Sequence, residues 1–586
     1  HAGGHRRRRQ SPPEGWLKKA MKAAGISFFP GPYRKEVEDA LDKMRRENIA
    51  ARIWSGDYRV WKSSPVEISN RLGWLHAPVE TLADAARIRE LVSPFRDGLE
   101  RVVLLGMGGS SLAAEVFGNI FGTAPGFPRL MIVDTTDPAT IRRVTEKINP
   151  AKTLFIVASK SGTTIEVVSL FNYFYNLAYE NLPVSARGRF LFISDEGSPM
   201  LAKALELQLP YVFSNNPDIG GRYSALSPAG IIPAALIGAP IDRLLENAAA
   251  AAQREKESCS AGRCDSGGFL LGAALGTLAR LGRDKLTLVL PRGWRSFGDW
   301  LEQLVAESLG KEGKGILPVV NEPPLDAELY ADDRIFVFFY RRRGAYDGRM
   351  EKLTAAGHPV FKIKINSDED LGGQMFLWEM GIAVAGHLMG VNPFDQPDVE
   401  ATKKHMALLI AGGGAVEKTS PGAAGATDGM EVYSEDVTSA VPAEALAGFL
   451  GGLCEKGYVA LQIYLSPSPG LRRALDELAA AILLRHKTAV TIGYGPRYLH
   501  STGQLHKGDR GSGLFIQLTG KDKDDLAIPE APGAGSSVMT FGELKAAQAE
   551  ADRRALVEKG RAVLSINFVK NPAAGIKKLA RVLKTF

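Results

Sequence analysis

The sequence predicts an α/β protein made of two doubly wound domains, each with a largely parallel sheet sandwiched by helices. Apolar runs of strand length recur between residues 100 and 221, and the stretches between them, such as residues 165–180, have the apolar spacing of helices. A second series of apolar runs follows between residues 285 and 568. Because strands buried on both faces read as continuous apolar runs, both series are typical of parallel sheets.

The elements divide the chain into four parts. Residues 1–29 indicate a basic, disordered tail, and residues 30–99 a helical lead-in. The first domain is expected at residues 100–245, with strands at RVVLLGMGG, RLMIVDTTD, TLFIVASKSG, RFLFISDEG and LPYVFSNN. The second is expected at residues 246–586, with strands at KLTLVLPRG, RIFVFFYRRR, PVFKIKI, YVALQIYLS, AVTIGYGP, GLFIQLTG and AVLSINF. Residues 412–429 and 528–537, rich in glycine, alanine and proline, are expected to be loops.

Composition narrows the classes of function. No apolar stretch reaches the ~18 to 20 residues that span a bilayer, so we expect a soluble protein with no membrane partner. The formal charge of +7 includes the four arginines at residues 6–9, and the balance suits a small anionic substrate rather than nucleic acid. Three cysteines are too few for a disulfide scaffold or a four-cysteine zinc site and favour a reducing, cytoplasmic compartment, although a Cys259–Cys264 pair stays open. The first fifteen residues lack the apolar core of a signal peptide, and the absence of an initiator methionine indicates a fragment or a processed chain.

The stretch SKSGTT, residues 159–164, directly follows the apolar run TLFIVA. Ligands of parallel sheets bind at this end of a strand, where helix N-termini offer unpaired N–H groups. One hydroxyl would suffice to cap the helix expected from Ile165. The four hydroxyls of Ser159, Ser161, Thr163 and Thr164 therefore indicate a cradle for a phosphate ester, with backbone amides exposed by Gly162.

The stretch GMGGSS, residues 106–111, ends the preceding strand in the same way, and its glycines allow close approach of the backbone to a ligand. As a dinucleotide fingerprint it is weak, because Ser111 stands where the last glycine belongs. Asp134, at the end of the next strand, keeps an NAD-dependent dehydrogenase open as an alternative.

Three segments of the second half carry candidate catalytic groups. Residues 297–315 predict an amphipathic helix that closes near Gly310, with Gln303 and Glu307 on one face. A helix expected from Pro397 brings Gln396 and Lys403 to a common face, and a loop after a later strand offers His500 and His506. Taken alone, a glutamate, a pair of lysines or a loop histidine in such places is more typical of a solvated surface than of a site.

Six motifs together resemble the glucose-6-phosphate isomerase family, which is built from two Rossmann-like sugar-isomerase (SIS) domains. The motifs are GMGGSS, SKSGTT, GGRYSALSPAG, AESLGKEGKG, GVNPFDQPDVEATKK and LHSTGQ. The likeness runs from about residue 35 to the end of the chain. It is closest to the isomerase half of bacterial bifunctional transaldolase/glucose-6-phosphate isomerases, so an upstream transaldolase domain, missing from this chain, is an expectation.

The resemblance implies metal-free and cofactor-free interconversion of glucose 6-phosphate and fructose 6-phosphate through a cis-enediolate. It implies that Glu307 is the base, that Arg222 stabilises the enediolate, and that His500 and Lys403 open the sugar ring while Glu166 orients the histidine. The implied substrate contacts are Gly109, Ser110, Ser159, Lys160, Ser161, Thr163, Thr164, Gln303 and Gln396. Elementary chemistry agrees, because aldose–ketose isomerisation needs a carboxylate base, a positive group beside the oxyanion and a group that titrates near neutrality.

The order of the groups departs from most of the family, because the histidine segment lies last, as in the bifunctional relatives. His506 is therefore a reserve candidate for the histidine. Whether the histidine acts in its own subunit or in the partner of a homodimer stays open, as does the use of mannose 6-phosphate. A non-catalytic SIS module that senses a phosphosugar would need the phosphate loop but not Glu307, Lys403 and His500 together.

Overall fold

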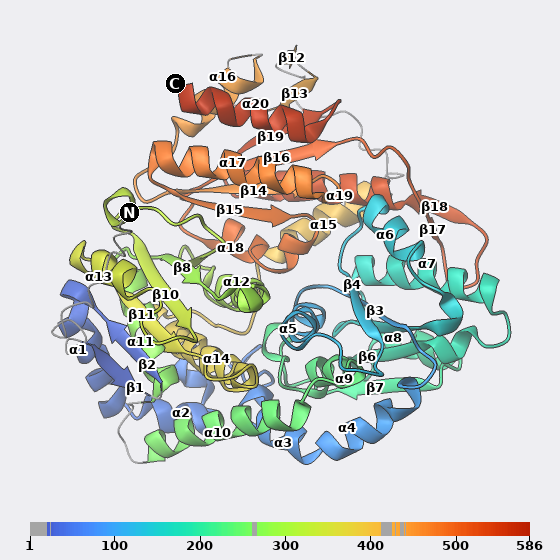
Figure 1. Ribbon diagram of the computed structural model, residues 1–586, viewed down its shortest axis with the longest axis horizontal. Coiled ribbons are helices and arrows are strands. Elements are labelled where there is room, and N and C mark those ends of the chain that lie inside the picture. Colours follow the sequence, from blue (N-terminus) through green and yellow to red (C-terminus); the bar gives the residue numbers. More distant parts are fainter. Residues whose placement is uncertain are drawn as a thin grey trace, which may run out of the picture.

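The computed structural model describes residues 20–23, 25–260, 266–411, 425–427, 429–433, 439 and 441–585. These residues form an α/β fold in which helices flank three mainly parallel sheets (Figure 1). The predicted fold class is confirmed, whereas the division into domains stays a prediction. All twelve strands named from the sequence are present, but those of the second half divide between two sheets.

The first sheet has the strand order β4-β3-β5-β6-β7, and every pair in it is parallel. Its strands are β3 (Arg101–Gly106), β4 (Arg129–Val133), β5 (Thr153–Ala158), β6 (Phe190–Asp195) and β7 (Tyr211–Asn215). Strand β4 follows β3 in the chain and lies on one side of it, whereas β5, β6 and β7 follow one another on the other side. The switch point therefore lies between β3 and β5, and ligands of such sheets bind in the crevice at that point.

The second sheet has the order β1-β2-β11-β10-β8-β9. Its parallel strands are β8 (Lys285–Val289), β9 (Leu317–Val320), β10 (Arg334–Tyr340) and β11 (Val360–Lys364). Helix α12 (Arg295–Leu309) follows β8 and ends directly before Gly310, as predicted. The helix is amphipathic, and its buried apolar side chains include Phe297, Trp300, Leu301, Leu304 and Val305.

The expectation of a disordered tail up to residue 29 is wrong for its last part. Strands β1 (Met21–Ala23) and β2 (Ile26–Phe29) form a hairpin, and β2 adds antiparallel to β11. Phe28 is buried and stacks on Phe361 with 4.2 Å between the ring centroids. The short apolar run ISFF was not recognised as a strand because it follows a basic segment. It is stabilised by pairing with the edge strand of a sheet formed by distant residues. Residues 1–19 and 24 lie outside the described part of the chain.

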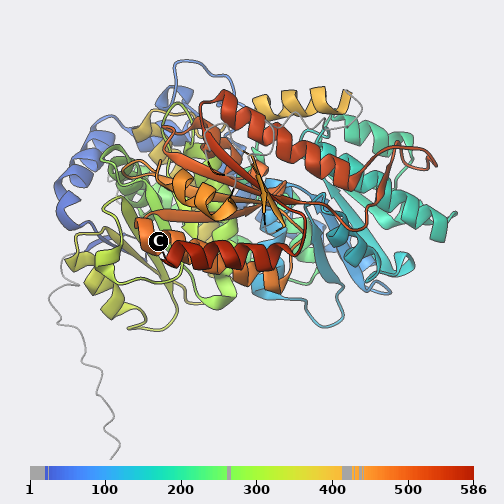
Figure 2. The same ribbon diagram turned by 90° about the horizontal axis from the view of Figure 1, so that it is seen from above.

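The third sheet has the order β12-β13-β19-β16-β14-β15. Its parallel strands are β14 (Tyr458–Tyr464), β15 (Ala489–Tyr494), β16 (Gly513–Gly520) and β19 (Ala562–Phe568), and β13 (Met430–Tyr433) pairs antiparallel with β19. Helix α19 (Phe541–Glu558) joins β16 to β19, and α15 (Val399–Ala411) packs along it, which Figure 2 shows from above. Helix α15 begins two residues later than the expected start at Pro397.

Parts of both expected loops are strands. Strand β12 spans Gly425–Thr427, and β17 (Ala527–Pro529) pairs with β18 (Ser537–Thr540) as a separate ribbon against α7 (Ile165–Asn181). Residues 412–424 and 428 lie outside the described part of the chain, as does the question of a Cys259–Cys264 pair. Among the helices that the structure describes, none is long and apolar enough to cross a membrane.

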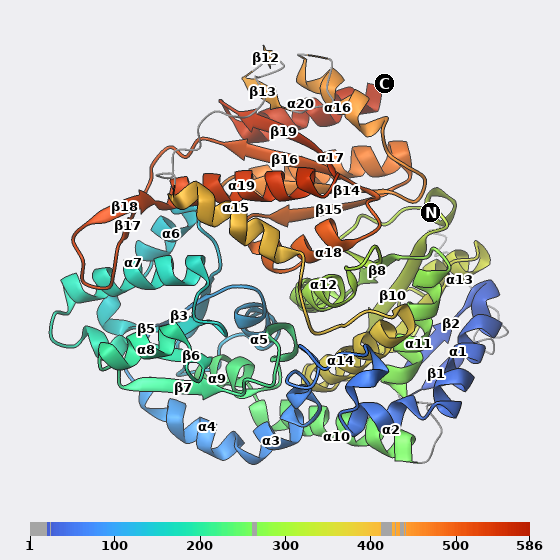
Figure 3. The same ribbon diagram turned by 180° about the vertical axis from the view of Figure 1, so that it is seen from behind.

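The three sheets meet around α5 (Leu112–Phe121) and α12, which lie near the middle of the molecule in Figures 1 and 3. Residues 34–92 supply four short helices on the outside: α1 (Arg34–Arg46), α2 (Ile49–Trp54), α3 (Ala77–Ala83) and α4 (Ala85–Val92). Segments far apart in the sequence thus reach one central region, where the candidate site lies.

Candidate active site

A pocket of about 770 Å³ opens where the loops after β3 and β5 face α12, α15 and the turn that ends at His500. All predicted site residues line this one pocket: Gly109, Ser110, Ser159, Lys160, Ser161, Thr163, Thr164, Glu166, Arg222, Gln303, Glu307, Gln396, Lys403 and His500. The structure therefore brings together groups that the sequence separates by as many as several hundred residues. No group of three or more His, Cys, Asp or Glu among the described residues is arranged to hold a metal ion.

The loop SKSGTT turns sharply between β5 and α7. Gly162 has φ +68°, and its N–H donates to Ser159 Oγ at 3.1 Å. The hydroxyls of Ser161 and Thr163 lie 3.0 Å apart on the exposed side of the loop. The Thr164 side chain makes no capping hydrogen bond to α7, contrary to the simple role of a helix cap. The first N–H groups of α7 therefore stay available for an anion, beside the positive end of the helix dipole.

The Lys160 ammonium points to the rim of the same loop. It forms an ion pair with Asp195 and donates to the Pro217 carbonyl at 2.9 Å. Its positive charge is therefore partly balanced by Asp195, while its position on the pocket lining keeps it within the site.

The glycine loop GMGGSS packs against the loop that carries Arg222. A Cβ atom on Gly109 would lie 2.2 Å from the Gly221 carbonyl oxygen, so no other residue fits without moving one of the two loops. Gly108 has φ +54°, and a Cβ there would meet Gln303 Nε2 at 2.8 Å. These glycines therefore serve a close backbone approach that positions Ser110 and Arg222 on one wall of the pocket.

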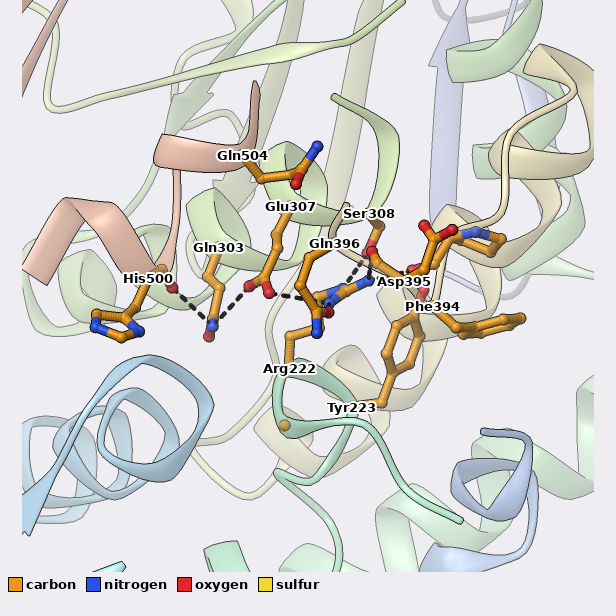
Figure 4. Close-up of polar contacts among 12 residues, drawn as sticks. Arg222, Tyr223, Gln303, Glu307, Ser308, Phe394, Asp395, Gln396, His500 and Gln504 are labelled. Atoms are coloured by element: carbon orange, nitrogen blue, oxygen red, sulfur yellow. Dashed lines mark hydrogen bonds and ion pairs between the residues drawn. The ribbon is translucent and has the colours of Figure 1, made fainter. Parts of the chain in front are cut away.

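Arg222 is 3% exposed and all of its guanidinium nitrogens are engaged (Figure 4). It donates at 2.7–3.0 Å to Ser308 Oγ, Glu307 Oε1, Gln396 Oε1 and the carbonyls of Pro393 and Asp395. Such a full set of acceptors fixes the plane of the guanidinium, which leaves its charge directly beside the Glu307 carboxylate.

Glu307 lies in the last turn of α12, between two donors. Its Oε1 accepts from Arg222 at 3.0 Å and its Oε2 from Gln303 Nε2 at 2.9 Å, and Gln303 Nε2 also donates to the His500 carbonyl at 2.9 Å (Figure 4). Gln303 Oε1 is buried and has no hydrogen-bond partner among the described residues, so it is available for a ligand hydroxyl. The carboxylate is thus held in place on the pocket wall.

His500 faces a second carboxylate, Glu166 in the first turn of α7. Its Nε2 lies 3.1 Å from Glu166 Oε1. Burial works to lower the pKa of His500, but the charge of Glu166, their hydrogen bond and the charge of Glu307 together raise it. Burial works to raise the pKa of Glu166, but the charge and the hydrogen bond of His500 lower it. Each group therefore favours the charged form of the other.

Lys403 stands on the open side of the pocket, where its side chain is 67% exposed and pairs with Glu400 at 2.6 Å. It is the only one of the predicted catalytic groups that projects largely into solvent within the described part of the chain. The reserve candidate His506 does not line the pocket. It is buried among Tyr458, Tyr498 and Phe515, and burial together with Lys507 and Arg561 holds its pKa well below the usual range.

Sequence reasoning missed several groups near the site. Asn70 and Arg71, from the outer helical segment, line the pocket beside the loop that carries Gly221. Lys507 lines it too and forms a buried ion pair with Asp552. None of these three residues belongs to one of the six motifs or follows the end of a strand. They reach the pocket through packing between distant segments, which no local sequence pattern indicates.

Comparisons with known proteins relate this chain to glucose-6-phosphate isomerases. Residues 66–275 match the family model "Phosphoglucose isomerase". The glucose-6-phosphate isomerase of Rubrobacter xylanophilus is 29% identical over 422 residues, which cover 63% of this chain and 94% of that protein. A probable glucose-6-phosphate isomerase of Haloarcula marismortui is 29% identical over 367 residues, covering 56% of this chain and 82% of that protein.

Solved structures show the same fold. A glucose-6-phosphate isomerase from Chlamydia trachomatis superposes with a TM-score of 0.56 at 19% identity, covering 69% of this chain and 92% of that one. A hypothetical protein from Thermus thermophilus superposes with a TM-score of 0.55 at 24% identity, covering 66% of this chain and 100% of that one. This chain is therefore similar to glucose-6-phosphate isomerases over more than half of its length, and it shares their fold.

Proposed function

We propose that this protein is a glucose-6-phosphate isomerase that interconverts glucose 6-phosphate and fructose 6-phosphate. The family model that matches residues 66–275 and the similar proteins named glucose-6-phosphate isomerase support the substrate pair. One observation carries the proposal: a hydroxyl-lined loop at a helix N-terminus and two paired carboxylates line the same pocket. Glu307 pairs with the buried guanidinium of Arg222, and Glu166 pairs with the imidazole of His500. One pair suits proton abstraction and the other suits proton delivery.

The phosphate of the substrate would bind to residues 159–164. The exposed hydroxyls of Ser161 and Thr163, the hydroxyl of Thr164 and the free N–H groups of α7 form a set of donors that suits a singly esterified phosphate. Lys160 would add a positive charge at the rim. The sugar would then extend toward Gly109, Ser110, Gln303 and Gln396 on the facing wall.

Ring opening requires a proton on the ring oxygen and removal of the proton from the hydroxyl at the anomeric carbon. His500 is the proton donor in this proposal, because Glu166 stabilises its protonated form. Water on the open side of the pocket would take the proton of the anomeric hydroxyl. Lys403, which lines that side, would stabilise the negative charge that develops on this oxygen as its proton leaves.

Isomerisation moves one proton between two neighbouring carbons. Glu307 would remove the proton from carbon 2 of the aldose, and the electron pair would shift to form the cis-enediolate with its charge on oxygen. Arg222, fixed beside Glu307, would stabilise this oxyanion, and the protonated Glu307 would return the proton to carbon 1. The hydroxyl proton on oxygen 2 meanwhile passes to oxygen 1. One proton thus changes carbon and another changes oxygen, so the step balances without a further reactant.

The test is an isomerase assay in D₂O, in which NMR follows both the formation of fructose 6-phosphate and deuterium uptake at carbons 1 and 2, with and without EDTA. Glu307→Gln should lower kcat at least ~100-fold while phosphosugar binding persists. Glu312→Gln, an exposed carboxylate that pairs with Lys62, is the matched control and should retain full activity. Turnover by Glu307→Gln at the wild-type rate would remove Glu307 from the role of base, and a wild-type protein without turnover would refute the proposed function.

A further inference from the structure

Glu166, which faces His500, is itself held by an amide from a distant helix. Gln548 lies in α19, and its Nε2 donates to Glu166 Oε1 at 2.7 Å, the same oxygen that faces His500 Nε2. Gln548 is 0% exposed and Glu166 is 4% exposed. Glu166 lies in α7, which follows β5 of the first sheet. Gln548 lies in α19, which precedes β19 of the third sheet (Figure 3).

The orientation of the Gln548 amide follows from its two partners. A carboxylate only accepts hydrogen bonds, so the amide nitrogen must face Glu166. The amide oxygen then accepts from Thr136 Oγ1 at 2.6 Å, and Thr136 is also fully buried. The chain of contacts therefore runs from Thr136 through Gln548 and Glu166 to His500, with a donor and an acceptor matched at each step.

The position of α19 relative to the first sheet is fixed by a second contact next to this one. Lys545, one turn before Gln548, pairs with Asp137 at 3.0 Å, and Asp137 follows Thr136 in the loop after β4. Ser466, from the third sheet, donates to the same Asp137 at 2.7 Å. Gln548 thus reaches Glu166 from a helix that is docked at two neighbouring points.

We propose that Gln548 is a positioning residue for His500, which it controls by holding the Glu166 carboxylate ionised and aimed at the imidazole. The catalytic meaning of this inference rests on the proposed function, because His500 acts on a sugar ring only in an isomerase. The hydrogen bond between Gln548 and Glu166 does not depend on the proposed function, so the role of Gln548 and the isomerase activity can be refuted separately.

The electrostatics of the site explain why Glu166 needs this support. Burial raises the pKa of the Glu166 carboxyl, and the charge and hydrogen bond of His500 oppose that effect. The other charged groups that face this pair are Lys403 and Glu307. Lys403 favours ionised Glu166 but lowers the pKa of His500, whereas Glu307 favours protonated His500. Tyr464 also faces Glu166, and its own pKa lies well above the usual value because of burial and Asp552. A neutral or misdirected Glu166 would cease to stabilise the imidazolium.

The decisive variant is Gln548→Met, which keeps the length of the side chain and removes both amide contacts. Two measurements are made: the titration of His500 by NMR on the full-length protein with labelled histidine, and the pH profile of kcat/KM. We expect His500 to titrate at lower pH than in the wild type. We expect kcat/KM to fall about tenfold at pH 8 and much less at pH 6, where both proteins keep the imidazole protonated.

Two further variants separate positioning from packing. In Gln548→Glu, a protonated carboxyl can donate to Glu166 as the amide does, so activity should approach the wild type at acid pH and fall steeply once that proton is lost. Gln517→Met is the matched control. Gln517 is also buried and donates at 2.9 Å to the Ala549 carbonyl of the same helix, but it does not contact Glu166. This control should leave the titration of His500 unchanged.

Thermal unfolding of each variant checks that the fold is intact. If Gln548→Met does not fold, the pair Thr136→Val and Thr136→Ser repeats the test, because only serine keeps the donor that orients the amide. Wild-type titration of His500 in Gln548→Met, or in Thr136→Val where that pair is used, would overturn the inference. A loss of activity that is the same at every pH would overturn it as well. If the wild-type protein shows no isomerase activity, the proposed function fails, yet the NMR titration still decides whether Gln548 controls His500.

Discussion

At the scale of single residues, the site depends on charges that are buried in pairs. Arg222 and Glu307 form one pair and His500 and Glu166 form the other, and Gln303 links them through Glu307 Oε2 and the His500 carbonyl. Removal of one partner from such a pair leaves the other charge buried and uncompensated, which costs far more than the pair contributes to stability. Substitutions that keep shape but remove charge are therefore the informative ones.

Glu166→Gln should shift the pH dependence of activity. The Glu166 charge raises the pKa of His500 against the effect of burial, so the wild-type imidazole stays protonated to higher pH than a buried histidine without a carboxylate partner. Without that charge, the alkaline limb of the kcat/KM profile should move to lower pH, with a loss of about tenfold or more at pH 8. Glu180→Gln, an exposed position in the same helix, is the control. An alkaline limb at the wild-type position would contradict the pairing.

Glu379 in α14 (Asp370–Met389) is the clearest case of a buried acid outside the pocket. It is 1% exposed, neither of its carboxyl oxygens has a partner among the described residues, and burial raises its pKa well above the usual value. The folded state therefore retains a proton that the unfolded chain releases. Stability contributed by this group falls as the pH rises above the ordinary carboxyl range.

Glu379→Met should accordingly stabilise the protein by about 1–3 kcal/mol at pH 7 and by less near pH 4, where both states are protonated. Chemical unfolding at the two pH values measures the difference. Glu379→Gln removes the titration but keeps two buried polar atoms, so its effect relative to the methionine variant should not depend on pH. A less stable methionine variant at pH 7 would show that Glu379 has a partner that the structure does not provide.

At the scale of elements, the two glycine-containing loops after β3 and β5 form the frame of the site. Gly109 lies against the backbone of Gly221, and any side chain would push apart the loops that carry Ser110 and Arg222. A displacement of about 1 Å at such a site costs on the order of 100-fold in rate. The loops thus connect a local sequence requirement to the geometry of the reacting groups.

Gly109→Ala should therefore reduce kcat/KM about 100-fold without unfolding the protein. Gly188→Ala is the control, because a Cβ there meets nothing within 4 Å. Steady-state kinetics and thermal unfolding measured on both variants separate a local shift from a general loss of structure. Normal kinetics in Gly109→Ala would mean that the two loops can part without cost to the site.

The properties of the elements also explain which strands and site residues could be predicted from the sequence. Continuous apolar runs identified the strands of the parallel sheets, and the hydroxyls of residues 159–164 identified a site because they stand at the end of a buried strand. β9, which contains Pro318, was missed because it is short, and the β1–β2 hairpin was missed because it lies beside a basic segment. Arg71 and Gln548 approach the site only through packing between distant elements, which leaves no local pattern. The relation to the bifunctional transaldolase enzymes stays a prediction.

At the scale of the whole molecule, the pocket is shared among parts of the chain that belong to different sheets. The phosphate-binding loop belongs to the first sheet, Glu307 lies on the helix after β8 of the second sheet, and His500 follows β15 of the third. A bound sugar phosphate would contact all three at once. Binding should therefore stabilise the native arrangement of the sheets, and not one sheet alone, through its preference for the folded state.

A sugar phosphate that lacks a carbonyl, such as sorbitol 6-phosphate, tests this without turnover. At a concentration 100-fold above its Kd, it should raise the free energy of unfolding by about 2.7 kcal/mol. Sorbitol without phosphate should have little effect, because the donors of residues 159–164 would stay unused, and Thr163→Val should weaken the shift. Glu307→Gln should keep it, because the base is not needed for binding. Differential scanning calorimetry measures the outcome, and a shift confined to one of several separate transitions would show that the ligand binds to one sheet unit alone.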